Sequence, residues 1–386
     1  DVITLVDYIF DRLGSRGSER IPDRCETEST RSLDGSGVAG EMTRIPEIAG
    51  DPVTPDIDII MPVYNGEEFI IKSLPPLLAM KQRGEVREVI VVDDSSTDSS
   101  AVTARDLGAR VISTGGRLGP GAARNQAAAE SAADLLWFVD SDVVVHDDAV
   151  EHLLPGFRDE KVVAVFGSYD DRPAAQNFLS LYKNLVHHHY HNRGRVEAST
   201  FWAGCGAVRK KAFLDVNGFD VGTYRRPSIE DIDLGYRLIE AGGLIRLVAS
   251  VKSSHLKVWR LFNLVHTEVF CRAIPWSRLM LTRSGLTDDL NVSTTERARA
   301  LLAGLLLLVM AAAVIGKMPW WSVLVLTVVV FATNRDLFLL FNRRKGLLFA
   351  LGGVAFHQLY YLYSGFAFVY SWLEFSWLKI RGKEIS

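Results

Sequence analysis

The strongest constraint on the fold is the alternation of short apolar runs with helix-like stretches that begins at Asp56. Four runs rich in β-branched residues are typical of strands: IDIIMPVYN, VREVIVVDDSS, ARVIST and LLWFVDSD. The stretches between them have helical spacing: EEFIIKSLPPLLAM, DSSAVTARDLG and GPGAARNQAAAESA. This alternation predicts an α/β fold, in which a parallel sheet carries helices on both faces.

Two acidic clusters stand at the ends of predicted strands. Asp93 and Asp94 follow the second strand, and Asp140-Ser141-Asp142 follow the fourth. Ligands bind at the carboxyl ends of strands in such sheets, so we expect both clusters to face one cleft. Because side chains alternate along a strand, Asp140 and Asp142 are predicted to point the same way and to suit Mg²⁺ or Mn²⁺. A solvated turn is the alternative interpretation.

Cationic residues give further candidates. Arg117 and Arg124 flank Gly119-Pro120-Gly121 at a predicted helix start. There they would bind phosphate, or alternatively they would be solvent-exposed residues of the helix terminus. His255 is either a third metal or diphosphate ligand or a surface histidine. The histidine cluster at 187–191, HHHYH, is expected far from the acidic motifs, so we do not assign it a metal.

Six motifs occur in an order that resembles family 2 glycosyltransferases. They are PVYNGEEFI, VIVVDDSSTDSS, RLGPGAARNQA, WFVDSDVVV, WAGCGAVRKKAFLDVNGFD and EDIDLGYRL. The resemblance covers about residues 56–255 and implies a GT-A nucleotide-sugar-binding domain with a mixed, mostly parallel sheet. It also implies an inverting, metal-dependent transferase of the hexosyltransferase type, which takes a sugar from a nucleotide-diphosphate sugar.

The resemblance also implies roles for single residues. The nucleotide-sugar contacts would be Pro62, Tyr64, Asp93, Asp94, Arg117, Arg124 and Asp140, and the metal ligands Asp140, Asp142 and His255. Asp231 would be the general base beside Glu230, which alternatively serves as a helix N-terminal charge. Acceptor-side contacts, or alternatively a structural turn, are expected at Trp202, Gly204, Cys205 and Gly206. Ser95 departs mildly from the family, which often has Gly there.

The C-terminal part has three runs without a charged residue, at 301–316, 318–333 and 346–373. One helix over the first two runs would be about 50 Å long, too long for a bilayer core. Gly316-Lys317-Met318-Pro319 is therefore predicted to be the turn of a helical hairpin, with Trp320 and Trp321 at the membrane interface. We expect a transmembrane region of about three helices; a buried helical core is the alternative.

The positive charges predict the orientation. Arginines and lysines flank both ends of the hairpin, so we expect both ends, and the catalytic domain, in the cytoplasm of a multi-pass inner-membrane protein. If the third run crossed fully, Lys379, Arg381 and Lys383 would lie outside, against the positive-inside rule. Whether that run crosses or re-enters stays open.

The segment before the spans is amphipathic. Its apolar residues recur at helical spacing, opposite Lys257, Arg260 and Arg272: Val258, Leu261, Phe262, Val265, Val269 and Phe270. With Trp259 and Trp276 they predict a helix on an anionic leaflet, or alternatively one packed on the catalytic domain. The expected order is an N-terminal helix and linker (1–55), the GT-A domain (56–255), interfacial helices (256–296) and transmembrane helices (297–386).

Composition and the remaining motifs narrow the function. A net charge of −3 gives no reason to expect a nucleic-acid partner, and three widely spaced cysteines argue against a disulfide or zinc framework. The favoured function is a membrane-bound glycosyltransferase with a lipid or lipid-linked acceptor. The alternatives are a processive polysaccharide synthase, although no Q-x-x-R-W motif precedes the spans, and a non-catalytic membrane scaffold. A dinucleotide-binding domain is disfavoured because GPGAAR does not fit G-x-G-x-x-G.

Overall fold

The computed structural model of the chain describes residues 56–283 and 290–381. The predicted N-terminal helix at 1–13 and the linker at 14–55 lie outside the described residues.

The first half of the sheet has the predicted order of strands and helices. Four parallel strands, β1 to β4, are Ile57–Val63, Glu88–Asp93, Arg110–Ser113 and Leu135–Val139. The helices between them are α2 (Glu67–Gln82), α3 (Ser100–Asp106) and α4 (Pro120–Glu130). Strands β1 and β4 are buried along their whole length, as strands covered on both faces must be. This arrangement brings the ends of β1, β2 and β4 to one edge.

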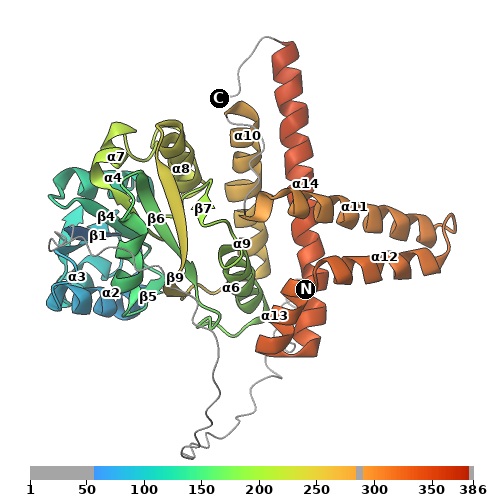
Figure 1. The fold of residues 1–386 in the computed structure, drawn as a ribbon, viewed down its shortest axis with the longest axis horizontal. Helices are drawn as coiled ribbons and strands as arrows, with labels where there is room; N and C mark the ends of the chain where they lie inside the picture. Colours follow the sequence, from blue (N-terminus) through green and yellow to red (C-terminus); the bar gives the residue numbers. More distant parts are fainter. Residues whose placement is uncertain (1–55, 284–289, 382–386) are drawn as a thin grey trace, which may run out of the picture.

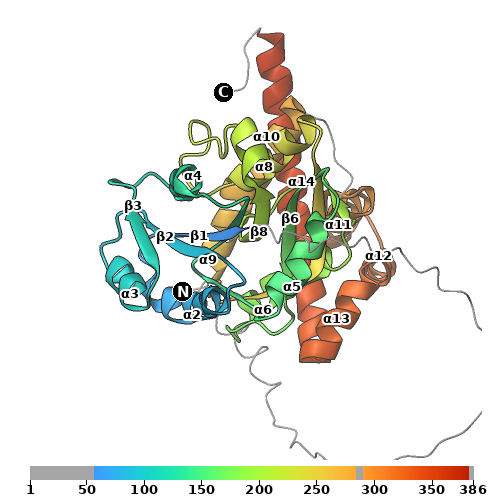
Figure 2. The ribbon, with the colours of Figure 1, turned by 60° about the vertical axis from the view of Figure 1, so that its left-hand side comes forward.

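The second half makes the sheet mixed. Strand β8 (Cys205–Arg209) runs antiparallel between β4 and β6 (Val162–Tyr169), and β9 (Leu244–His255) runs parallel to β6. Two short strands, β5 (Val143–Val145) and β7 (Glu197–Ala198), pair antiparallel with β9. The order is β3-β2-β1-β4-β8-β6-β9-β5, most of which can be followed in Figure 2. The mixed sheet confirms the predicted fold class.

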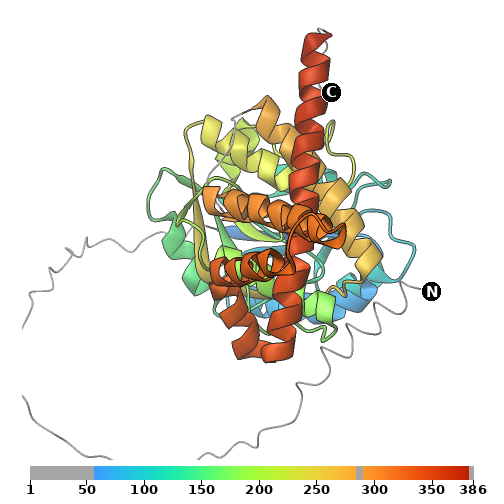
Figure 3. The same ribbon diagram turned by 90° about the vertical axis from the view of Figure 1, so that its right-hand side faces the viewer.

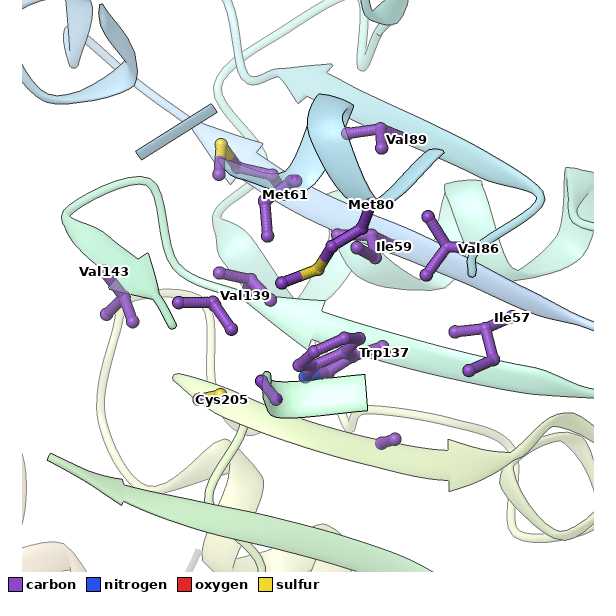
Figure 4. Close-up of a cluster of buried hydrophobic side chains, with 14 of the residues drawn as sticks. Ile57, Ile59, Met61, Met80, Val86, Val89, Trp137, Val139, Val143 and Cys205 are labelled. Carbon is purple, nitrogen blue, oxygen red and sulfur yellow. The ribbon is translucent and has the colours of Figure 1, made fainter. Parts of the chain in front are cut away.

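Two apolar clusters cover the faces of the sheet. The first contains Met80 of α2, Trp137 of β4 and Cys205 of β8, and Figure 4 shows these side chains together. Helix α5 (Ala149–Leu153) and the 3-10 turn η1 (Leu154–Phe157) complete that face. The second cluster lies under α4, α7 (Lys210–Asp215) and α8 (Glu230–Glu240). The domain therefore has three layers, helices, sheet and helices (Figure 1).

A helical region lies beside the sheet domain. Helix α6 (Phe178–His191) packs in a third apolar cluster with α13 (Arg335–Lys345) and α14 (Leu347–Ile380). The segment predicted to be interfacial is one helical stretch: α9 (Leu261–His266), the π-helical turn η2 (Thr267–Ala273) and α10 (Ile274–Thr282). A short turn, η3 (Leu290–Val292), precedes α11 (Thr294–Val314).

The predicted hairpin is present. Helix α11 ends at Val314 and packs against α12, Trp320–Thr333, so the turn falls at Gly316 to Pro319 as expected. Among the described residues, α11 is long and apolar enough to cross a membrane by itself. Helix α12 would do so only together with α13, from which it is bent by 74°. Helix α14 is not among these candidates, although a third span was predicted there; its interior carries the polar residues His357 and Gln358.

Candidate active site

The acidic motif after β4 forms a turn and not a strand end. Strand β4 stops at Val139, the amide of Val143 donates to the carbonyl of Asp140 (3.0 Å), and β5 then begins. Asp140 and Asp142 therefore do not lie in a strand, and strand alternation, on which the prediction of their direction rested, does not apply to them. Their carboxylates have different partners, because the chain reverses to pair β5 with β9.

Arg124 holds one side of this turn. It is a buried residue of the second turn of α4, not of its first, and its Nη2 donates to Asp140 Oδ1 at 2.5 Å. Its Nη1 lies 3.7 Å from Glu230 Oε1, and its guanidinium stacks over the Phe219 ring. Burial raises the pKa of the Asp140 carboxyl, and the Arg124 cation offsets only part of that effect. Arg124 therefore links the acidic turn to the start of α8.

His255 holds the other side of the turn. It ends β9, pairs with Val143, and its Nε2 lies 3.4 Å from Asp142 Oδ2. Its ring is stacked on Tyr169, with the ring centroids 4.7 Å apart. Burial alone would raise the pKa of Asp142, but His255 and Lys257 hold it below its usual value. A histidine at the acidic motif was predicted, and the structure brings the two together.

Buried donors in this site have no hydrogen-bond partner within the described residues. They are Nε and Nη1 of Arg124 and Nδ1 of His255. Buried polar groups are nearly always paired, so these atoms fit a ligand that brings anionic oxygens, such as a diphosphate. No group of three His, Cys, Asp or Glu side chains in the described part of the chain is arranged to hold a metal by itself.

Asp231 and Glu230 begin α8. Asp231 accepts hydrogen bonds from the amides of Ala203 (3.1 Å) and of Ile232 (2.9 Å). Burial, followed by the charge of Glu230, raises the pKa of Asp231 to about 7. Glu230 accepts from the amide of Ser228 at 2.7 Å and approaches Arg124, so it stabilises the loop and the arginine. Asp231 has the protonation equilibrium that a general base at neutral pH requires.

The pair after β2 organises the neighbouring loop. Asp94 accepts from the amides of Leu118 and Gly119, each at 2.8 Å, and Asp93 accepts from the amide of Ser96 at 3.1 Å. Ser95, which follows Asp94, has φ of +63°, a left-handed conformation that favours glycine. The departure seen in the sequence therefore falls at a position where glycine would be the less strained residue.

Tyr64 and Arg117 lie at the exposed rim beside this pair. The guanidinium of Arg117 lies over the Tyr64 ring, 4.1 Å from its centroid. Arg117 lies on the loop before α4, and Pro62, the third residue predicted on this side, is buried within β1. Of the two arginines flanking the glycines, Arg124 points into the acidic centre and Arg117 stacks at the rim.

The four predicted acceptor-side residues divide into two groups. Cys205 and Gly206 are buried in β8, and burial raises the pKa of the Cys205 thiol to about 12. Because both residues are buried within the sheet, the structure gives no support for the prediction that they contact an acceptor. The carbonyl of Gly204 accepts from the amide of Asp140 at 3.1 Å, and Trp202 lies over Tyr169, with centroids 4.8 Å apart. Trp202 therefore stays a candidate.

The histidine cluster is nearer to the acidic turn than expected. His187 lies 4.3 Å from the Tyr169 ring and 4.7 Å from the Trp202 ring, measured between centroids. Tyr169 in turn stacks on His255. The expectation of distance is wrong, because α6 returns across the end of β6. Burial keeps the pKa of His187 well below its usual value, so the imidazole is neutral.

The amphipathic segment is partly exposed and partly buried. Phe262, Val265 and Phe270 are exposed, but Trp259 is only 2% exposed and belongs to the cluster around α6. The prediction of an interfacial tryptophan at 259 is wrong, because that residue precedes the helix and fills the core. Trp276 is also buried, where its indole donates to the Tyr236 hydroxyl at 3.1 Å.

Sequence reasoning missed two residues at this end of the site. Arg272 pairs with Glu268 (3.0 Å), and Lys183 of α6 pairs with the same carboxylate (2.8 Å). Burial opposes the charge of Arg272, but Glu268 and Asp231 raise its pKa above the usual value. The sequence pattern placed Arg272 on the polar face of an amphipathic helix and gave it no role in the site. Lys183 lies between the recognised motifs, so no sequence pattern pointed to it.

The mixed sheet, covered by helices on both faces, is a fold of the GT-A type. The chain is similar to a mannosyltransferase from Pyrobaculum calidifontis, solved with GDP-Man and Mn²⁺, with a TM-score of 0.54 and 18% identity. That likeness covers 82% of this chain and 91% of the other, and at this identity it concerns the fold alone. Residues 58–216 match the family model described as glycosyl transferase family 2.

Two similar proteins are named as glycosyltransferases. The chain is 29% identical over 259 residues to the pre-mycofactocin glycosyltransferase of Mycobacterium tuberculosis, covering 63% of this chain and 52% of that relative. It is 27% identical over 319 residues to an N-acetylglucosaminyltransferase of Rhizobium meliloti, covering 73% and 72%. The chain spans about half the length of the first of these relatives. The family match and the relatives together support a family 2 glycosyltransferase.

Proposed function

We propose that the chain is a membrane-attached, inverting glycosyltransferase of the hexosyltransferase type, which moves a sugar from a nucleotide-diphosphate donor to a lipid or lipid-linked acceptor. The observation that carries the proposal is the group formed by Asp231, Arg124 and the acidic turn. Arg124 joins Asp140 to Glu230, the neighbour of Asp231. A carboxylate with a pKa near 7 therefore stands beside unpaired donors suited to a diphosphate.

The donor would lie along the edge formed by the ends of β1, β2 and β4. Asp93, Asp94 and the Tyr64–Arg117 pair are proposed to hold the base and ribose, with Pro62 shaping the strand beneath. Arg124 would bind the diphosphate through its free Nε. Asp140, Asp142 and His255 would hold Mg²⁺ or Mn²⁺ together with the phosphates. Such a cation stabilises the charge that develops on the leaving diphosphate.

The chain's own residues would perform the rest of the reaction. The acceptor hydroxyl oxygen attacks the anomeric carbon, and the bond from that carbon to the phosphate oxygen breaks. Asp231 takes the hydroxyl proton, and the nucleoside diphosphate leaves. Arg272, whose charge acts on Asp231, would keep part of that carboxyl ionised, and Trp202 would offer a flat face to the acceptor.

The exposed apolar residues support an acceptor in the bilayer. Phe262, Val265 and Phe270 lie on the segment that also carries Arg272. Helix α11 is apolar enough to enter a membrane, and Arg297 and Arg299 stand at its start. By the positive-inside rule the catalytic domain would face the cytoplasm, where nucleotide sugars are made available.

Transfer into a lipid extract tests this function. The protein is reconstituted in vesicles with lipid extract, Mn²⁺ and each of several radiolabelled nucleotide sugars. We expect label from one donor in the organic phase, a loss of about 10²-fold or more in Asp231→Asn, and no loss in Asp134→Asn, which changes an exposed carboxylate. A ladder of water-soluble products would indicate a processive synthase instead. No transfer from any donor would favour the scaffold.

A further inference from the structure

Helix α14 and the hairpin run in different directions. In Figure 1 the hairpin of α11 and α12 extends across the page, away from the sheet domain, whereas α14 stands upright, and Figure 3 shows α14 upright again. The chain turns by 74° between α12 and α13 before α14 begins. If the hairpin lies along the normal of a bilayer, α14 therefore lies parallel to the plane of that bilayer.

Part of the exposed apolar surface of α14 forms a stripe, and Val369 and Trp372 are exposed beside it. Leu359, Phe366, Leu373 and Ile380 follow one another at seven-residue spacing and are between 52% and 84% exposed. Tyr370 and Trp377 widen the same stripe, because residues three or four apart share a helix face. The stripe extends about 32 Å along the axis, from 21 residues at 1.5 Å each.

The opposite face of α14 is covered. Glu374 forms an ion pair with Arg278 of α10 at 2.8 Å, and Ala367 and Ser371, on the same side of the helix, are buried. The apolar stripe of α14 therefore lies on another side of the helix than the contact with α10, except at Ile380, which lines a surface hollow together with Leu281 of α10. A helix with one face packed on protein and one apolar stripe exposed is suited to a membrane surface.

Basic and aromatic groups surround the stripe. Lys379 and Arg381 stand at the end of α14, and the Arg381 guanidinium lies over the Trp377 ring at 4.0 Å. Arg343 lies in the last turn of α13, which leads into α14, whereas the neighbouring Arg344 is paired with Asp171 of the sheet domain. These charges complement an anionic leaflet, and tryptophan prefers the headgroup level.

We propose that α14 lies flat in the surface of an anionic lipid bilayer, its stripe at the boundary of headgroups and acyl chains. The hairpin is then the membrane-inserted part among the described residues, and Arg381 stays on the same side as the catalytic domain. This orientation removes the conflict with the positive-inside rule that a crossing third run would create. The inference rests on the membrane attachment proposed above.

Depth measurements with spin labels test the orientation. Cys25 and Cys271 are changed to Ser, and Cys205 stays because its buried thiol does not react. Nitroxides are placed singly at the four stripe positions and at Leu301, Leu308 and Ile315, which are exposed at the same seven-residue spacing on and just beyond α11. Each variant is measured in anionic vesicles by its accessibility to oxygen and to a polar relaxation agent.

We expect one shallow depth at all four α14 positions, and along α11 the greatest depth at Leu308 with shallower positions at Leu301 and Ile315, because these three positions span about 21 Å of a helix that crosses the bilayer. A comparable change of depth along α14 would overturn the inference and leave membrane attachment standing. Aqueous accessibility at all seven positions would overturn the attachment as well. As a second readout, Arg381→Cys and the exposed Lys211→Cys are labelled with an impermeant thiol reagent on sealed vesicles. Labelling from the same side supports the inference, and labelling from opposite sides contradicts it.

Discussion

Asp231 is the residue whose protonation state decides the proposed reaction. Its carboxylate is stabilised by two amide donors, yet its burial and the nearby Glu230 raise its pKa from 3.8 to about 7. The basic form therefore dominates only above neutral pH. Below pH 7 the Asp231 carboxyl is mostly protonated and cannot accept the proton of the acceptor hydroxyl.

The pH profile follows from this shift. We expect kcat/KM to rise about tenfold per pH unit up to pH 7 and then to level off, and Asp231→Asn to remove this limb with donor binding intact. A series of initial rates at saturating and limiting acceptor, from pH 5 to pH 9, measures it. Near-normal turnover of Asp231→Asn would mean that the acceptor is already ionised, as a phosphate is.

Ser95 gives a test of local strain in the nucleotide loop. A non-glycine residue at φ +63° is strained by roughly 1 kcal/mol, although glycine also costs chain entropy. We therefore expect Ser95→Gly to be at least as stable as the natural chain and Ser95→Val to be less stable by ~1 kcal/mol or more. Thermal unfolding of the three proteins compares them, and a Val variant as stable as the Gly variant would contradict the strain.

Among the elements, the strands and helices up to β4 could be predicted because their periodicity is local. Buried, β-branched runs such as Ile57–Val63 leave little choice of structure. The turn at Asp140 could not be predicted, because it depends on β5 pairing with β9 more than a hundred residues later. The approach of His187 to Tyr169 and the burial of Trp259 also follow from packing between distant segments.

The base of the hairpin is held by a buried polar network. Glu296 of α11 accepts from the Tyr190 hydroxyl of α6 (2.9 Å) and the Tyr361 hydroxyl of α14 (2.7 Å), and it pairs with Arg299 (2.5 Å). The Tyr361 hydroxyl also lies 3.1 Å from the amide oxygen of Asn334. One carboxylate thus joins the hairpin to the helix that packs on the sheet domain.

Replacing this carboxylate should loosen the junction. Because Glu296→Ala leaves the largely buried Arg299 cation without its carboxylate and removes one acceptor from each tyrosine, we expect a loss of ~3 kcal/mol. Thermal unfolding in detergent measures it, with the exposed Arg335→Ala as the control. If Glu296→Ala and Arg335→Ala unfold at the same temperature, the network does not hold the hairpin.

For the molecule as a whole, we propose that the exposed apolar side of α9 and η2 connects the site with the bilayer. Phe262→Asp with Phe270→Asp should raise the KM for a membrane acceptor by at least about tenfold and leave donor binding unchanged, because burying one phenyl ring gives roughly 2 kcal/mol. The matched control is Val102→Asp, an exposed position on α3. An equal effect in the control, or no effect of the Phe pair, would argue against acceptor entry at this face.

The most direct test is metal-dependent binding of one nucleotide sugar. Thermal unfolding of the detergent-solubilised protein is measured with a panel of donors, with and without Mn²⁺ or Mg²⁺, alongside Asp142→Ala. We predict that one donor stabilises the protein only with metal, by ~2.7 kcal/mol at a hundred times its Kd, and that the variant loses this response. No metal-dependent response to any donor, or an undiminished one in the variant, would contradict the account.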